Sequence, residues 1–333
     1  MKTSSDLSSL ALQLLRKLDI RVAAGGRTDW HLILPNGLTH SVRVQVRRQP
    51  PPPSWVKNLR PLVADTSLLI VTGHITPYLR EQAQQRSLDV IDIENETAII
   101  AGSTFALTPS DSLPGYTASV ARGRKPWVRW ATERLLMLSD EPITQAEIAA
   151  ALAVTQQSVS YVLRAHRYAR RAVDGWSIKD KRRQLDGYLL EYPGPGGASA
   201  YWFQLGYSVQ QADDATSFIA EMGMSALRTG DAAADKYAPW RLPLTASIYS
   251  TEILDFTPAG FTPAGIDEHT LRVTVPEDST IWKTAAVASS ITRRSDLVDP
   301  IVALYDVLRS PGADAAEAAD RLRQAIIEGS WRG

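Results

Sequence analysis

The chain has 333 residues, 44% of them hydrophobic, so it can bury two or three separate cores and is not generally disordered. It has no cysteine, which excludes disulfides, thiolate catalysis and cysteine-bound zinc. Its 36 basic and 36 acidic residues balance, which by itself argues against a nucleic-acid partner. No apolar run approaches the ~20 residues that span a membrane, and the first residues lack the basic and apolar regions of a signal peptide. We therefore expect a cytoplasmic protein with no membrane partner.

The first 115 residues are predicted to form an α/β domain. An amphipathic helix at 7–18 comes before two strands, at 30–34 and 41–47, which a Pro-Asn-Gly turn connects. The proline run at 50–53 cannot continue a strand and is expected on the surface. The remaining predicted elements are a helix at 55–63, a buried strand at 67–72, a helix at 77–86 and strands at 88–93 and 97–101. This alternation implies an α/β sandwich.

The order of these elements is similar to the restriction-endonuclease-like fold. In that family a carboxylate and an E/Q-x-K element on neighbouring strands hold a divalent metal. The matching residues here are Asp29 and Gln45-Val46-Arg47, in which arginine replaces the lysine and no second acid is present. Arginine cannot become a neutral base, and one carboxylate holds a hard cation weakly. We expect a degenerate domain without metal or nuclease activity; a working nuclease and a wholly different fold are the alternatives.

Residues 127–178 have the pattern of a helix-turn-helix with a short wing. The first helix, 128–138, carries one apolar stripe. The second opens with Thr144-Gln-Ala-Glu147, which is a capping box. The third is capped by Thr155 and runs to about residue 167. Asp174-Gly175 then signals a tight hairpin, in which we expect Val173 to pack inward. The predicted DNA-binding domain spans 122–184.

The third helix has the composition of a recognition helix. Its predicted inner side carries Val159, Val162, Leu163 and His166. The other side carries Gln, Ser, Tyr and Arg and no acid, and Gln, Ser and Arg are residue types that recognise base edges. The candidate DNA-binding residues are Thr155, Gln156, Gln157, Ser158, Ser160, Tyr161, Arg164 and Arg167 on this helix, Arg170, Arg171, Trp176 and Lys179 around the wing, and Arg124, Lys125 and Arg129 before it. The alternative is a plain helical bundle with a solvated face.

The distribution of charge favours the DNA-binding interpretation. Residues 116–184 contain 13 Lys and Arg against 6 Asp and Glu, a net charge of +7. Residues 1–115 have a net charge of +2, and residues 185–333 have one of −9. Phosphate binding requires such a local excess of basic residues.

Residues 185–333 are predicted to form a mixed α/β domain. A helix from 181 to 192 ends at a glycine-rich run, 193–197, which we interpret as a connection because no helix with Lys-Ser/Thr follows it. The further elements expected are strands at 200–205, 244–249 and 271–275 and helices at 215–227, 300–308 and 315–328. In the helix at 300–308, Asp299 is the expected cap and Pro300 the first residue.

Motifs from about residue 120 onward resemble those of the AbiEi-type antitoxins. After the helix-turn-helix come an L-L-x-Y element within 188–192, a G-x-x-A-A element at 230–234 and a long L-V-D-P motif that begins at Leu297. The resemblance implies a transcriptional regulator of a type IV toxin–antitoxin system. It also implies a nucleotidyltransferase-like toxin as a partner.

We therefore expect a sequence-specific DNA-binding regulator, an antitoxin-like repressor of its own operon, that binds operator double-stranded DNA and could act as a homodimer. No catalytic residues and no cofactor are expected, since the histidines show no metal-ligand spacing and no P-loop or G-x-S-x-G motif is present. Two alternatives are a DNA nuclease that the helix-turn-helix targets, and an adaptor whose acidic C-terminal region binds a basic partner.

Overall fold

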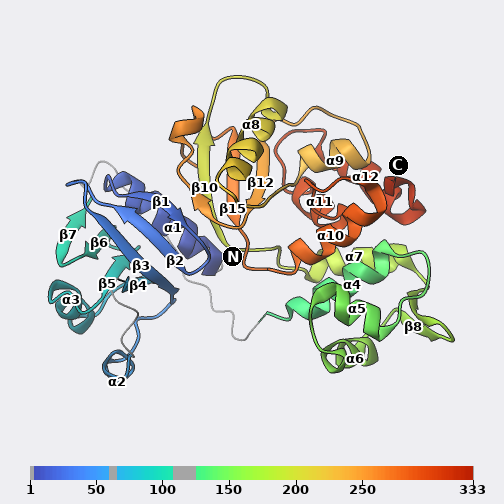
Figure 1. Cartoon of the computed structure of the whole chain (residues 1–333), viewed down its shortest axis with the longest axis horizontal. Coiled ribbons are helices and arrows are strands. Elements are labelled where there is room, and N and C mark those ends of the chain that lie inside the picture. Colours follow the sequence, from blue (N-terminus) through green and yellow to red (C-terminus); the bar gives the residue numbers. More distant parts are fainter. Residues whose placement is uncertain (1–3, 60–65, 108–124, 333) are drawn as a thin grey trace.

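Figure 1 shows the computed structural model of the chain, which describes residues 4–59, 66–107 and 125–332. The fold is mixed α/β, as the sequence predicts. The described strands form an eight-stranded sheet, a five-stranded sheet and a two-stranded hairpin. In Figure 1 the larger sheet lies at the left, the five-stranded sheet in the centre and a mostly helical part at the right. No helix in these ranges is both long and apolar enough to cross a membrane.

The larger sheet is built mainly from the N-terminal region. Its strands are β1 (Arg21–Gly25), β2 (Asp29–Ile33), β3 (Thr39–Val46), β4 (Thr66–Thr72), β5 (Asp89–Asp92), β6 (Thr97–Ile100) and β7 (Ser103–Ala106), and each pairs with the next. The β3–β4 and β4–β5 pairs are parallel and the others antiparallel. The eighth strand, β13 (Ile253–Leu254), comes from the C-terminal region and pairs with β1.

Helices cover both faces of this sheet. Helix α1 (Ser4–Lys17) packs its leucines against one face, while α2 (Pro53–Lys57) and α3 (Pro77–Gln84) pack against the other. On β4, Leu69 faces the α1 side and Ile70 the opposite side, and both are fully buried. A strand covered on both faces is apolar at successive positions, which is why this stretch is a continuous apolar run.

The predicted elements of this region are confirmed with small shifts at their ends, but three strands were not anticipated. These are β1, β7 and β13. The predicted helix at 55–63 is shorter, since α2 ends at Lys57 and residues 60–63 lie outside the described part of the chain.

The middle of the chain forms three helices and a hairpin, as predicted. The helices are α4 (Trp127–Leu138), α5 (Gln145–Leu152) and α6 (Gln156–Ala165), and the hairpin pairs β8 (Ala169–Ala172) with β9 (Gly175–Ile178). Leu135, Ile148 and Val159, one from each helix, meet in a shared core.

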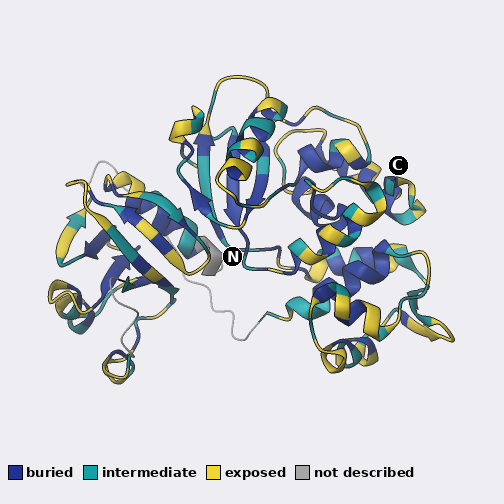
Figure 2. Ribbon diagram, in the orientation of Figure 1, coloured by how far each residue is buried: buried dark blue, intermediate teal, exposed yellow. Residues whose placement is uncertain are grey.

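Helix α4 is buried on all sides from Trp130 to Leu138, and Figure 2 shows it almost entirely dark blue. Ala131 and Leu135 face α5 and α6. Met137 and Leu138 face a second core, which contains helix α7 (Lys181–Glu191) and the C-terminal helices. The predicted domain boundary at 184–185 falls inside α7.

The C-terminal region contains the second sheet and five further α-helices. The sheet order is β11 (Ala226–Arg228), β12 (Ala246–Ser250), β15 (Leu271–Val275), β10 (Ala198–Phe203) and β14 (Thr262–Pro263). Helix α8 (Ser208–Glu221) covers one sheet face. The helices beside α4 and α7 are α9 (Asp231–Tyr237), α10 (Ile281–Thr292), α11 (Pro300–Val307) and α12 (Ala315–Glu328). The 3₁₀ turns η2 (Thr257–Ala259) and η3 (Ser330–Arg332) complete the region.

One prediction in this region had the wrong bounds. The predicted helix at 215–227 begins earlier and ends at Glu221, and the last residues of that range belong to β11. Helices α9 and α10 and strands β11 and β14 were not predicted, whereas the elements at 271–275, 300–308 and 315–328 are confirmed.

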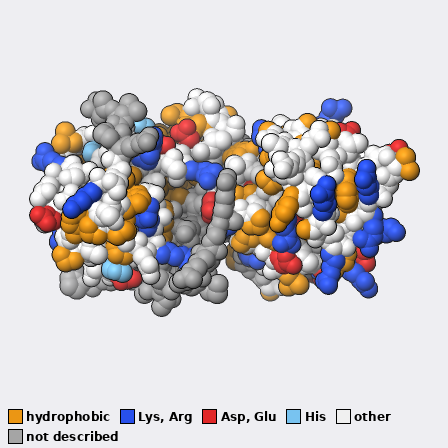
Figure 3. Space-filling view, turned by 90° about the horizontal axis from the view of Figure 1, so that it is seen from below, with side chains coloured by type: hydrophobic (Ala, Val, Ile, Leu, Met, Phe, Trp, Pro, Cys, Tyr) orange, Lys and Arg blue, Asp and Glu red, His pale blue; other side chains and the backbone are white. Residues whose placement is uncertain are grey.

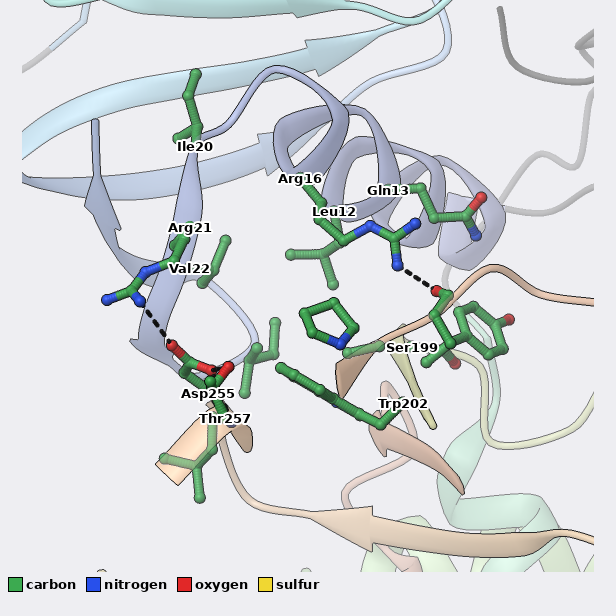
Figure 4. Close-up of a pocket in the computed structure, with 16 residues that line it drawn as sticks. Leu12, Gln13, Arg16, Ile20, Arg21, Val22, Ser199, Trp202, Asp255 and Thr257 are labelled. Carbon is green, nitrogen blue, oxygen red and sulfur yellow. Dashed lines mark hydrogen bonds and ion pairs between the residues drawn. The ribbon is translucent and has the colours of Figure 1, made fainter. Parts of the chain in front are cut away.

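The N-terminal and C-terminal regions meet where α1 and β1 approach β10, and Figure 4 shows this junction. Leu12 and Trp202 line a small apolar pocket there. At its rim Arg21 lies 3.6 Å from Asp255, and Arg16 donates to the carbonyl of Ala264.

A buried arginine on α4 joins four parts of the chain. The side chain of Arg134 is fully buried. Its guanidinium meets the hydroxyls of Tyr188 (3.1 Å), Tyr192 (3.2 Å) and Thr280 (2.8 Å) and the carboxylates of Asp278 (3.2 Å) and Asp299 (3.5 Å). Burial raises the pKa of both tyrosines well above the usual range, so they are neutral.

Asp299 also begins α11. One carboxylate oxygen accepts from the backbone N–H of Ile301 (3.0 Å) and of Val302 (3.1 Å), which confirms the predicted cap. The other accepts from the hydroxyl of Thr284 at 2.6 Å. The same carboxylate therefore orients α11 and balances the charge of Arg134.

We predict that Arg134→Met destabilises the protein by about 3–5 kcal/mol, because it leaves two buried carboxylates without their cation. Equilibrium urea unfolding followed by tryptophan fluorescence measures the loss, and Trp130 packs edge-on against Tyr188 within this cluster. The matched control is Arg183→Met, whose side chain is 75% exposed and whose effect should stay within about 0.5 kcal/mol. Equal losses in the two variants would contradict the role given to Arg134.

Candidate nucleic-acid interface

Local capping fixes the two helices that precede the hairpin. The side chain of Thr144 accepts from the N–H of Glu147 (3.2 Å), and Glu147 accepts from the N–H of Thr144 (2.8 Å), so the predicted capping box is confirmed. Ala153, with φ 54°, ends α5 in the left-handed conformation. Thr155 then caps α6 by accepting from the N–H of Ser158 at 3.2 Å. The turn between the helices is therefore short and well defined.

Helix α6 has one buried face and one outward face. Val159 and Leu163 are buried, while Tyr161 is 79% exposed. The candidates that lie at the surface of α6 or directly beside it are Thr155, Gln156, Gln157, Ser158, Arg164 and Arg167, and Ser160 is half-buried. No Asp or Glu occurs between residues 148 and 173. The outward face therefore presents hydrogen-bonding and basic groups without a competing acid.

The hairpin is attached to the helices through Ile143, which lies in the segment between α4 and α5. The backbones of Ile143 and Trp176 exchange two hydrogen bonds, of 2.9 and 2.8 Å. Gly175 has φ 148°, and a Cβ added there would lie 2.6 Å from the backbone of Ile143, so only glycine allows this approach. Val173 is fully exposed at the tip of the hairpin, so the prediction that it packs inward was wrong.

His166 connects the end of α6 to the hairpin. Its Nδ1 accepts from the backbone N–H of Tyr168 (3.2 Å) and of Ala169 (2.9 Å). Its Nε2 lies 3.7 Å from the Glu133 carboxylate on α4. Burial, and then the nearby Arg129, lower the pKa of His166, so Nδ1 stays an acceptor. This bridge sets the angle between α6 and β8.

The basic candidates separate into unpaired and paired groups. Arg164, Arg167, Arg170, Arg171 and Lys179 have no carboxylate oxygen within 4.0 Å among the described residues. Figure 3 shows basic side chains gathered on the end of the molecule that holds α6 and the hairpin.

The other basic candidates are less available to a ligand. Lys125 lies 2.7 Å from Glu277, and Arg129 pairs with Glu133 at 2.8 Å and also with Glu191. The chain's own acids thus largely neutralise both, which their positions in the sequence did not indicate. Arg124 lies outside the described residues.

A cleft of about 1270 Å³ runs beside α6. Its lining includes Gln157, Tyr161 and Arg167 from α6 and the residues after it, and Trp127 and Leu190 from α4 and α7. Leu190 was not among the residues predicted from the sequence. Leu190 lies about 140° around α7 from the buried Leu185, so it is an isolated apolar residue on the polar face of that helix. This position is the feature of the sequence that could have indicated a role at the surface.

The nuclease candidates in the N-terminal sheet do not come together as a metal site. Asp29 accepts from Arg43 at 3.0 Å and from the hydroxyl of Thr28. The guanidinium of Arg47 lies 4.0 Å above the ring of Trp55. Within the described ranges no group of three or more His, Asp or Glu is placed to hold a metal ion.

Comparison with known proteins identifies no relative: no protein-family model matches the chain, and no curated protein or solved structure matches it.

Proposed function

We propose that residues 127–178 form a winged helix-turn-helix and that the protein is a sequence-specific DNA-binding transcriptional regulator. The observation that carries this proposal is the outward face of α6, which has no acid and lies beside a hairpin with unpaired arginines. In such folds the second helix of the motif enters the major groove and its N-terminal residues contact base edges. Thr155 to Arg167 would take that position here.

The two groups of basic side chains have different proposed roles. Gln157 and Arg164 would contact base edges, because glutamine can pair with adenine and arginine with guanine. Arg170, Arg171 and Lys179 would contact phosphates from the hairpin. Lys125 and Arg129 are already paired with acids, so we now give them a structural role.

The N-terminal sheet and the resemblance to antitoxins extend this proposal. We propose a degenerate restriction-endonuclease-like domain that contributes a binding platform without catalysis, and an antitoxin-like role in a toxin–antitoxin operon. A nucleotidyltransferase-like reading frame beside the gene, whose product co-purifies with this protein, would support that role. An unrelated neighbour would restrict the proposal to DNA binding, by a monomer or a homodimer.

Arg164→Ala should weaken binding to the preferred duplex by ~1–3 kcal/mol and relax the preference at one base pair, because one base contact is lost. Fluorescence anisotropy on a duplex selected from a random pool, and on random DNA, measures both effects. Arg80→Ala, which removes an exposed arginine of α3, is the control and should change neither. If Arg164→Ala kept the wild-type ratio of specific to random binding, Arg164 would not contact bases.

The double variant Arg171→Gln with Lys179→Gln should flatten the dependence of log K on log salt by about two units, because two phosphate contacts disappear. The slope is obtained from anisotropy titrations at several salt concentrations. Arg129→Gln is the comparison and should leave the slope nearly unchanged, since its charge is already paired. If Arg129→Gln flattened the salt slope more than the double variant did, Arg129 would contact phosphates and the two hairpin residues would not.

We predict that the purified protein leaves supercoiled DNA carrying its own promoter intact in Mg²⁺ and in Mn²⁺. Hydrolysis by this fold needs two acidic groups on the metal and a lysine, and the matching strands offer Asp29, Gln45 and Arg47. Agarose gels detect cleavage. The control is Asp320→Ala, which removes an exposed acid. If the wild type and Asp320→Ala cleaved the DNA and Asp29→Ala did not, the protein would be a nuclease and not only a regulator.

A further inference from the structure

The second sheet has one polar face that does not point to open solvent. On the α8 side its strands bury apolar residues, among them Trp202, Ile248 and Val273. The opposite face carries polar side chains at alternate positions of three neighbouring strands: Ser199, Tyr201, Ser247, Tyr249, Arg272 and Thr274. A sheet face covered by other elements is ordinarily apolar, so this one calls for an explanation.

This polar face lines a cleft of about 410 Å³. Helix α1 borders the cleft through Ser9 and Gln13, and the glycine-rich loop at 193–197 borders it on another side. The end of α11 closes it with Tyr305, Asp306 and Arg309. Sites for small molecules commonly have volumes of roughly 300–1,000 Å³. The cleft therefore has the size of a small-molecule site and is too small for duplex DNA.

Arg272 differs from the other arginines of the C-terminal region that lie inside the fold. Arg228 lies 2.6 Å from one aspartate, and Arg241 lies 2.8 Å from another. Arg272 has no carboxylate oxygen within 4.0 Å and donates no hydrogen bond to any described residue, although it lies in the central strand β15. The charge of Asp306 acts on Arg272 from beyond this distance, but the N–H donors of Arg272 meet no acceptor among the described residues and are available to a ligand.

The remaining charges of the cleft also favour an anion. Arg309 lies 3.5 Å above the ring of Tyr305 and donates to its carbonyl at 2.8 Å. Asp306, the one acid among the described residues that line the cleft, already accepts from Thr229 at 2.5 Å and from Tyr249 at 2.7 Å. Burial raises the pKa of Asp306, and the positive charge of Arg272 opposes this shift. Two guanidinium groups thus face one acid that is already hydrogen-bonded.

Aromatic surface lies beside these charges. Tyr201 and Tyr305 both line the cleft, and the glycine-rich loop approaches Tyr305 closely. A Cβ added at Gly194 would lie 2.6 Å from the Tyr305 hydroxyl, so only a glycine lets the loop and the ring adopt this arrangement. Arg309 covers one face of the Tyr305 ring, so a planar group would pack against the remaining surface of that ring. Arginine binds phosphate or carboxylate through two parallel hydrogen bonds.

We propose that this cleft binds a small anion with a planar ring, of the chemistry of a nucleoside monophosphate, with Arg272 and Arg309 on the anionic group and the tyrosines beside the ring. The site lies between the C-terminal region and α1 and does not depend on the proposed DNA binding.

The test is isothermal titration calorimetry of the full-length protein, without DNA, against AMP, GMP, CMP and UMP. At least one of them should bind, and more tightly than inorganic phosphate or the matching nucleoside. Arg272→Gln and Arg309→Gln should each weaken binding about 10-fold or more, because a charge-assisted hydrogen bond is lost. Arg80→Gln removes the same charge from an exposed position on α3 and should leave the affinity unchanged.

Three results would overturn the proposal: no binding of any monophosphate, equal affinities in wild type and both cleft variants, or phosphate alone binding as tightly as the nucleotides. Circular dichroism and thermal melting show whether each variant folds. Arg272 lies in a central strand, whereas Arg309 is exposed after the end of α11, so Arg309→Gln decides the matter if Arg272→Gln does not fold.

Discussion

The arrangement of α4, α7 and the C-terminal helices depends on the burial of Arg134. A guanidinium cannot leave water without partners, and its partners come from α7, from the segment at 278–280 and from the start of α11. These segments are far apart in sequence, so Arg134 has this set of partners only when all of them are in place. Next to it on α4, Glu133 makes a separate set of contacts with Arg129, Gln184 and His166. Two adjacent charges thus fix α4 to the C-terminal core and to the end of α6.

The Arg134 cluster is in contact both with the edge of the polar cleft and with α4, which packs against α6. Tyr305 at the edge of the polar cleft packs against Tyr192, with ring centroids 5.1 Å apart. Tyr192 contacts Arg134 on α4, and α4 shares its other face with α6. The cleft and the outward face of α6 are therefore separated by packed side chains and one helix rather than by a flexible connection. A ligand that shifted Tyr305 would act on a side chain already in contact with the Arg134 cluster.

The features that were predicted from the sequence are mostly local ones. The Thr144–Glu147 capping box, the Asp299 cap and the Asp-Gly hairpin each depend on residues within a few positions, and each is confirmed. The buried side of α6 was also predicted, since helical spacing alone determines it. Contacts between distant residues were missed. No local pattern indicates that Lys125 meets Glu277 or that Arg134 is buried, because an arginine on a helix is ordinarily exposed. The prediction for Val173 was wrong because the turn, and not the alternation of a strand, determines the direction of a side chain at a hairpin tip.

The pairing of β13 with β1 has a consequence for how the chain can be divided. Ala24 and Gly25 are hydrogen-bonded partners of a strand that lies more than two hundred residues later in the sequence. A fragment ending near residue 115 would keep the first seven strands but leave the backbone of β1 open at the sheet edge. Open edges recruit other strands and lead to aggregation. An incomplete chain emerging from the ribosome has the same open edge until β13 has been synthesised, so the N-terminal sheet acquires its protected form only late in translation.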